Sequence, residues 1–414
     1  MRFLWSKYKY RLLLFLSVFG PATIAAIADN DAAGVATYSL AGAKFGYSIL
    51  FVLIYITILL AVTQEMGVRI ATITGKGLAD LIRERYGVRV ALFVFLLLFI
   101  ANLGTIIANF SGLKAVAIMF NLPSIPLMAV VIILGFLFIS KGDYKTNQKI
   151  FLLGTILYVS YIFSAFRANP DWGKAILNLF VPVDVKLSRD FIFASIAVLG
   201  TTITPWGQFF VNSFVIDKKI QPDKLKYSQI ETYFGAFLTD FFSFFMIVAT
   251  ASTLFAHGIN LTSGEQAALA IKPFAGELAS FLFGFGLLNA AIMGIIIISL
   301  TTAYAFSEFF GYVGSLDAPF ERGRLFYGIF LFQLIVAALI VILPFASLFK
   351  IVFYTQSLNA ILLPLIFFFL LKITNNKELM GGYTNSKWYN YFAIVSSAII
   401  ILASSFVIIS SFVK

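Results

Sequence analysis

The sequence has no cysteine and only one histidine, His257, among its 414 residues. The lack of cysteine excludes disulfides, thiolate metal sites and thiol catalysis. His257 lies beside Gly258 in a predicted loop, where a solvated side chain is expected and not a metal ligand.

Charged residues are also scarce: they make up 12% of the chain, whereas 60% of it is hydrophobic. A soluble globular protein is about a quarter charged, so this composition indicates an integral membrane protein. No signal peptide is expected, because the first apolar run is too long and no cleavage site comes after it. Eleven apolar segments of about twenty residues, the length that spans a hydrocarbon core, are centred near residues 27, 58, 103, 131, 156, 203, 243, 292, 336, 361 and 402.

The net charge of +11 follows the expected topology and does not indicate a nucleic-acid partner. With a cytoplasmic N-terminus and eleven alternating helices, the inner segments hold 20 Lys and Arg and the outer segments 9. Anionic inner-leaflet lipid and the membrane potential favour this bias. We expect an N-terminus inside, a C-terminus outside, the lipid bilayer as surroundings and no obligatory protein partner. The lack of long tails favours a prokaryotic cell membrane. The membrane of a eukaryotic organelle is the alternative location.

Two of the apolar segments are interrupted. The first, Pro21 to Gly34, contains "ADNDAAG" (28–34), and the second is "LGTTITPWGQFF" (199–210). They open two five-helix sets, and interrupted helices at corresponding positions of two halves indicate an inverted-repeat transporter. We predict one transmembrane domain over 1–414, with repeats at about 12–166 and 190–373 and an extra helix at about 388–413. The simpler interpretation is that Pro and Gly merely kink two packed helices.

Asp31 lies at the first break, where half-helix ends and freed carbonyls can surround a cation. A carboxylate inside a membrane costs at least ~2.5 kcal/mol, and a bound divalent cation would offset that cost. The alternative is a structural carboxylate bonded to helix-end amides.

Three stretches resemble the Nramp family of divalent-metal transporters, which have a LeuT-like fold. "DNDAAGVATYSLAGAKFGY" (29–47) is similar to the helix-1 motif, Asp-Pro-Gly-Asn with an Ala-Thr and a Gly-Tyr further along. "QEMGVRIATITGKGLADLIRERYG" (64–87) resembles the family's helix 2 and the loop after it. "YTQSLNAILLP" (354–364) is similar to helix 10. The resemblance implies an all-α membrane protein with a 5+5 inverted repeat, about 11 helices, and breaks in helices 1 and 6.

The resemblance also implies a set of metal ligands. Asp31 matches the motif aspartate, and the backbone carbonyls of Ala28 and Thr201 match carbonyl ligands of the family. Gln356 resembles the helix-10 glutamine that reaches the ion when the site closes. Thr204 stands in the place of a methionine, and it either coordinates the ion, directly or through water, or caps the broken helix.

The departures from the family point to a different ion. A hydroxyl in place of the methionine sulfur leaves an oxygen-only site, which suits Mg²⁺. Gly34 replaces the motif asparagine, which should enlarge the site for an ion that dehydrates reluctantly. We expect Mg²⁺ first and Mn²⁺ second as transported substrates, and no resident cofactor.

The groups that carry the coupled proton in typical members are also missing. Asn109 falls near the expected helix-3 glutamate and Val211 near the expected helix-6 histidine. Helix 9, "FYGIFLFQLIVAALIVILP", holds no charge. A proton then has no stepwise path. These changes, with "LLNAAIMGIIIISLTTAYAFSEFFG" (287–311), resemble the branch of Nramp-related magnesium transporters.

Other polar residues leave more than one role open. Asp29 either lines the vestibule or bonds neighbouring backbone, and Asn30 flanks the site beside it. Asp240 has no evident partner, so a secondary cation or vestibule role stays open. Glu65 and Arg69 have the spacing of an intrahelical ion pair, structural or part of the inner gate. Glu308 is expected to be solvated.

The expected function is uncoupled Mg²⁺ transport by alternating access. One alternative is a proton-coupled Mn²⁺/Fe²⁺ Nramp transporter. Another is an intramembrane prenyltransferase-type enzyme, but only one Asp-rich motif is present and no basic residue lies near it. A LeuT-like amino-acid transporter is disfavoured by the Nramp-like helices 2 and 10. We therefore expect a transporter and not an enzyme.

Overall fold

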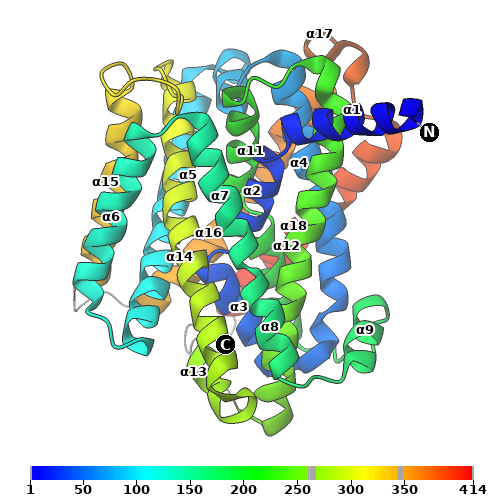
Figure 1. The fold of residues 1–414 in the computed structure, drawn as a ribbon. Coiled ribbons are helices and arrows are strands. Elements are labelled where there is room, and N and C mark those ends of the chain that lie inside the picture. The colour runs from blue at the N-terminus through cyan, green and yellow to red at the C-terminus, as the bar shows by residue number, and fades with distance from the viewer. Residues whose placement is uncertain (1, 184, 260, 262–266, 344–347, 413–414) are drawn as a thin grey trace.

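The computed structural model describes residues 2–183, 185–259, 261, 267–343 and 348–412. Within this part of the chain every regular element is helical (Figure 1). The α-helices are α1 (Arg2–Val18), α2 (Pro21–Ala28), α3 (Ala32–Phe45), α4 (Phe51–Thr74), α5 (Leu78–Met119), α6 (Ser124–Lys141), α7 (Tyr144–Leu157), α8 (Val159–Arg167), α9 (Trp172–Phe180), α10 (Arg189–Thr202), α11 (Pro205–Asp217), α12 (Leu225–Thr253), α13 (Ala267–Ala270), α14 (Lys272–Phe310), α15 (Arg324–Ile342), α16 (Leu348–Thr374), α17 (Lys377–Met380) and α18 (Lys387–Phe412). The 3-10 helices are η1 (Gly46–Ile49), η2 (Pro222–Lys224), η3 (Phe255–His257) and η5 (Gly381–Tyr383).

The helices fall where the eleven apolar segments predict them. In the described part, seven are long and apolar enough to cross a membrane: α4, α5, α6, α7 with α8, α12, α14 and α15. The other four expected spans correspond to α2 with α3, α10 with α11, α16 and α18. The first two of these are interrupted, so neither half is a full span by itself.

Both interruptions fall where the sequence predicts them, and both restart on a capping side chain. α3 begins after Asp31, whose carboxylate accepts a hydrogen bond from the Gly34 amide. α11 begins after Thr204, whose hydroxyl accepts from the Gly207 amide. Each cap satisfies an amide that has no partner inside its own helix. The two restarts share the same spacing, with the cap three residues before a glycine.

The first segment has a second bend that the sequence did not predict. The apolar run from Leu12 contains α1 as a separate helix, and the part of it over Lys9–Val18 meets α2 at 53°. Gly20 lies between them with φ 137°, a conformation that glycine adopts readily and other residues rarely do. Pro21 then opens α2, where its missing amide hydrogen costs nothing.

The ends of the molecule are arranged as alternating spans require. α1 and α17 lie at one end, and α9 and α13 lie at the opposite end (Figure 1). Between the two ends, α2 and α3 pack against α12, and the long helices α5 and α14 pack against each other. The first break therefore lies inside the bundle, and a hydrogen bond from Thr204 to Asp29 places the second break beside it.

Candidate metal site

Asp31 is held in place by the start of α3 and by α5. Its Oδ1 accepts from the Gly34 amide at 2.8 Å, and its Oδ2 accepts from Asn109 Nδ2 at 2.7 Å. Asn109 also accepts the Ala32 amide on Oδ1 at 2.9 Å. The side chain of Asp31 is 3% exposed. The side-chain amide of Asn109 thus fixes both the Asp31 carboxylate and the first turn of α3. The sequence could not show this contact, because the two residues are 78 positions apart.

The two breaks free the two carbonyls named above. In a continuous helix the Ala28 carbonyl would pair with the Ala32 amide, but that amide donates to Asn109 instead. The Thr201 carbonyl would pair with residue 205, which is proline and has no amide hydrogen. Carbonyls without an intrahelical donor are the groups that coordinate cations at broken membrane helices.

Thr204 connects the second break to the first. Its hydroxyl accepts from the Gly207 amide at 3.1 Å and donates to Asp29 Oδ1 at 2.7 Å. The capping role of Thr204 is therefore present, and the same hydroxyl faces the acidic residues of the other repeat. Asp29 therefore contacts the side chain of Thr204, the residue that caps α11, and its role is not limited to bonding neighbouring backbone.

Gly34 and Gly207 allow close approach of these oxygen atoms. A Cβ at position 34 would lie 2.7 Å from the Asp29 carbonyl oxygen and 3.5 Å from Asp31 Oδ1. A Cβ at position 207 would lie 2.9 Å from Thr204 Oγ1 and 3.2 Å from Asp29 Oδ1. The larger metal site expected from the small side chain of Gly34 is not present in this conformation. The backbone carbonyl of Asp29 occupies the space beside Gly34.

The other candidates lie around this centre. Asn30 points to α12, where it donates to the Thr239 carbonyl at 2.8 Å and accepts from Ser243 at 2.9 Å. Asp240 also lies on α12, and its Oδ2 contacts Thr57 Oγ1 of α4 at 2.6 Å. Gln356 belongs to α16, but its side chain lies outside the described part of the chain.

The acidic side chains of the centre have no basic partner in the described part of the chain. Among the described residues, no ion pair involves Asp29, Asp31 or Asp240. No group of three His, Cys, Asp or Glu side chains there could hold a metal. A cation would therefore be bound by one or two carboxylates with carbonyl, hydroxyl and water oxygens, which are ligands that hard divalent ions prefer.

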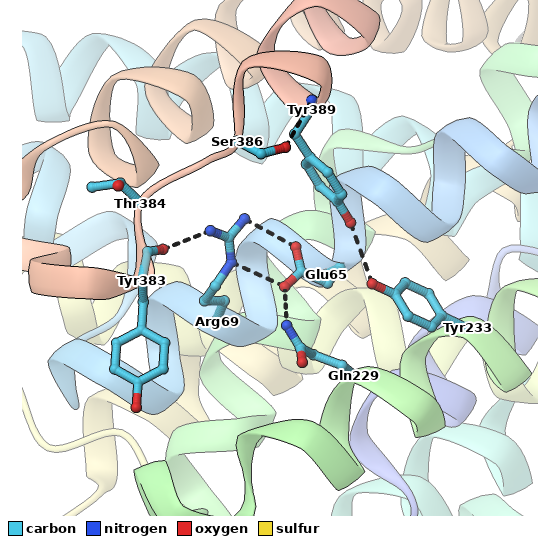
Figure 2. A pocket seen from close by; sticks show the side chains of 8 residues that line it. All are labelled: Glu65, Arg69, Gln229, Tyr233, Tyr383, Thr384, Ser386 and Tyr389. Atoms are coloured by element: carbon cyan, nitrogen blue, oxygen red, sulfur yellow. Dashed lines mark hydrogen bonds and ion pairs between the residues drawn. The ribbon is translucent and has the colours of Figure 1, made fainter.

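The Glu65–Arg69 pair occupies a separate place at the α17 end. The guanidinium donates to Glu65 at 2.9 and 3.0 Å, to the Tyr383 carbonyl at 2.6 Å and to Asn385 at 2.5 Å. Gln229 donates to Glu65 at 2.7 Å (Figure 2). Tyrosines flank the pair in a cavity of about 260 Å³. The predicted ion pair is thus present, and it ties α4 to the segment before α18.

Sequence reasoning missed the contacts that hold the hinge between α1 and α2. Glu231 of α12 accepts from the amides of Gly20, Ala22 and Thr23, at 3.1, 3.2 and 2.6 Å. This carboxylate caps α2 from a distant helix, where a negative charge also favours the helix dipole. An acidic residue inside an apolar helix was the only signal for it.

Lys218, which follows α11, holds the same hinge from the other side. Its Nζ donates to the Phe19 carbonyl at 2.5 Å and to Gln148 Oε1 at 3.2 Å. Burial lowers the pKa of Lys218 to about 8, against the opposing effect of the Glu231 charge.

Glu308 was expected to be solvated, but it is only partly exposed and both of its carboxylate oxygens have partners. Its Oε1 accepts from Ser213 at 2.5 Å, and its Oε2 accepts from the Ala79 amide at 3.3 Å. Glu308 therefore caps the start of α5, because the first amides of that helix have no intrahelical acceptor.

Comparison with known proteins gives one family. The model of the family "Natural resistance-associated macrophage protein-like" (Nramp) matches residues 22–410. A Dictyostelium discoideum "Natural resistance-associated macrophage protein 2 homolog" is 26% identical over 92% of this chain, which spans 61% of that relative. The "Divalent metal cation transporter MntH" of a Nostoc species is 23% identical over 96% of this chain and 91% of its own. The protein of that name in Staphylococcus aureus strains is 26% identical, with coverage of 94% and 89%.

Solved structures agree on the fold. A manganese transporter of Eremococcus coleocola superposes with a TM-score of 0.76 at 18% identity, covering 95% of this chain and 86% of its own. The nucleobase-cation-symport-1 family transporter Mhp1 in a closed conformation gives 0.55 at 15% identity, with coverage of 93% and 89%. These neighbours share the LeuT-like fold, which confirms the fold expected from the sequence.

Proposed function

Because the chain belongs to the Nramp family, we propose that it moves divalent metal cations across a membrane, Mg²⁺ first and Mn²⁺ as well. The named relatives are divalent metal transporters, which favours transport over the prenyltransferase-type enzyme. The cation is the transported substrate and not a resident cofactor. Asp31, the carbonyls of Ala28 and Thr201, Thr204 and, on closure, Gln356 are its ligands in this proposal.

The chemistry of the donor set supports Mg²⁺. Asp31, the two freed carbonyls and the Thr204 hydroxyl all offer oxygen, and the methionine sulfur that suits softer ions is absent. Mg²⁺ takes one or two carboxylates and keeps several waters. Mn²⁺ should pass too, because carboxylate, carbonyl and water ligands suit both ions.

The absence of proton coupling is supported by the surroundings of Asp31. Asn109, in the place of the expected acidic residue, uses its amide on Asp31, the Ala32 amide and the Thr105 carbonyl. An amide does not titrate, so this position cannot pass a proton on. Val211 is likewise unable to titrate, and it is fully buried.

Transport is proposed to follow alternating access. Asp31 and Thr204 are 3% and 4% exposed, so the described conformation is closed around the site. The bundle would open alternately to each side by moving the half-helices. With the N-terminus cytoplasmic in a prokaryotic cell membrane, a divalent ion gains ~4.6 kcal/mol per 100 mV on moving inward, which makes a coupled proton unnecessary.

The second candidate is a proton-coupled Mn²⁺/Fe²⁺ transporter. One observation favours it: the solved structure with TM-score 0.76 is named a manganese transporter. A likeness at 18% identity supports a shared fold and not a shared substrate. The oxygen-only donors of this chain favour a harder ion than Mn²⁺ or Fe²⁺.

Uptake into proteoliposomes separates the two. One dye reports Mg²⁺ or Mn²⁺ inside the vesicles, and a second reports internal pH in the same vesicles. Mg²⁺ entry without acidification is expected. Mn²⁺ entry with acidification and without Mg²⁺ entry would establish the proton-coupled alternative and refute the proposal.

A further inference from the structure

Asp29 has one carboxylate oxygen that no described group satisfies. The residue is 1% exposed. Its Oδ1 accepts from Thr204 at 2.7 Å, but its buried Oδ2 has no hydrogen-bond partner in the described part of the chain. Leaving a buried carboxylate oxygen without a partner is costly, so such an atom indicates a missing ligand.

The free oxygen lies beside the second break. Measured from the Cβ that residue 207 would have, Asp29 Oδ2 is 3.5 Å away, Oδ1 is 3.2 Å away and Thr204 Oγ1 is 2.9 Å away. The backbone carbonyl of Asp29 borders Gly34, whose own Cβ position lies 3.5 Å from Asp31 Oδ1. Asp29 therefore reaches both restarts, whereas the neighbouring Asn30 turns away to α12.

Charge balance points the same way. Asp29 and Asp31 are both buried, and no ion pair of the described residues involves either of them. Two ionised carboxylates carry the charge that one divalent cation neutralises. A site with Asp31 alone would hold a divalent ion with one positive charge left over, which is unfavourable away from water.

We propose that Asp29 is a second carboxylate ligand of the transported divalent cation, with Oδ2 facing the ion and Thr204 orienting the carboxylate through Oδ1. This inference rests on the proposed function, because it assumes that the ion binds at the helix breaks. Gly207 belongs to the same arrangement. A side chain there would occupy the space that Asp29 and Thr204 now share.

A purely structural role explains less. As an acceptor for Thr204, Asp29 would need one oxygen, and an asparagine would serve equally well. Neither the second, unpartnered oxygen nor the uncompensated charge follows from that role. The two interpretations therefore differ in the effect of Asp29→Asn on metal binding.

The test is calorimetric titration of the purified full chain with Mn²⁺ and with Mg²⁺. Asp29→Asn keeps an oxygen for the Thr204 hydroxyl and removes the charge. We expect it to weaken binding of both ions at least about tenfold, since even outer contacts of a metal site cost that much. The thermal unfolding temperature of the ion-free protein should not fall.

Asp240→Asn is the matched control. Asp240 is also buried, contacts a threonine hydroxyl and has one unpartnered oxygen, but its hydroxyl partner is Thr57 of α4 and not a residue of either break. Its substitution should leave the affinity unchanged. Equal weakening by both variants would mean a general effect of replacing a buried acid and would overturn the proposal, as would a wild-type affinity in Asp29→Asn.

A second variant covers the case in which Asp29→Asn does not fold. Gly207→Ala leaves both carboxylates in the chain but places a methyl group against Asp29, so binding should weaken again. Unchanged affinity in Gly207→Ala would count against the inference. If the wild-type chain bound neither ion, the proposed function itself would fail, a result distinct from wild-type binding that survives Asp29→Asn.

Discussion

The Thr204 hydroxyl donates a 2.7 Å hydrogen bond to Asp29 Oδ1, and this contact joins the breaks of the two interrupted helices. It links residues 175 positions apart, one from each predicted repeat. Any movement that separates the two breaks has to break this bond. The contact therefore couples the geometry of the site to the state of the bundle.

Asp31→Ala should abolish uptake of Mg²⁺ and Mn²⁺. The substitution removes the carboxylate that both Gly34 and Asn109 hold in place. Loss of an N-cap also costs about 1 kcal/mol of stability, so size-exclusion profiles and unfolding temperature must accompany the uptake assay. Uptake at the wild-type rate by the folded variant would remove Asp31 from the mechanism.

Thr204→Met should raise the affinity for Mn²⁺ or Cd²⁺ relative to Mg²⁺. A thioether is a soft ligand and favours these ions over a hard one. The variant also loses the cap on Gly207 and the bond to Asp29, so absolute affinities will fall. The ratio of affinities is the quantity to measure, with Thr204→Ser as the control that keeps the hydroxyl. An unchanged ratio would show that residue 204 does not face the ion.

Asp240→Asn should transport at close to the wild-type rate. Thr57 Oγ1 lies 2.8 Å from the Leu53 carbonyl and 2.6 Å from Asp240 Oδ2, yet a hydroxyl has one hydrogen. Both contacts are hydrogen bonds only when Asp240 supplies a proton, and an asparagine amide can donate in its place. A large loss of uptake in the folded variant would show that Asp240 works as a charged group. Asp240→Ala, which removes the donor, is the informative comparison.

The Lys218 contact should give a stability that depends on pH. Its pKa is about 8 in the folded protein, whereas an unburied lysine has a pKa of about 10.4. Between these values the unfolded chain binds the proton and the folded protein does not, so stability rises with pH across that window. Below about pH 8 both states are protonated and the contribution is constant.

The measurement is the unfolding temperature of the detergent-solubilised protein against pH, for the wild type and for Lys218→Met. Other groups titrate in the same range, so the difference between the two curves isolates Lys218. We expect the unfolding temperature of the wild type to rise relative to that of the variant from about pH 8 to about pH 10.4. A flat difference would contradict the burial of the ammonium group.

Local patterns predicted the breaks but not the contacts between them. Pro205 and the Asp31–Gly34 stretch interrupt helices by backbone chemistry, which a sequence displays directly. The partners of Asp31 and of α2 depend on how distant helices are rotated, and an apolar span gives little sign of rotation. Asn109 and Glu231 could be identified only once α5 and α12 were in place. The interrupted start of the first span was missed because Gly20 looks like any glycine in an apolar run.

The position of Arg69 has a consequence for the C-terminal helix. Its guanidinium is buried and donates hydrogen bonds to the Tyr383 carbonyl and to Asn385, two residues that lie just before α18. A shortened chain that ended before residue 383 would leave those donors empty beside Glu65. The segment that leads into the eleventh helix, which belongs to neither predicted repeat, is thereby anchored to α4, and deleting this segment together with the helix would leave a buried guanidinium without two of its acceptors.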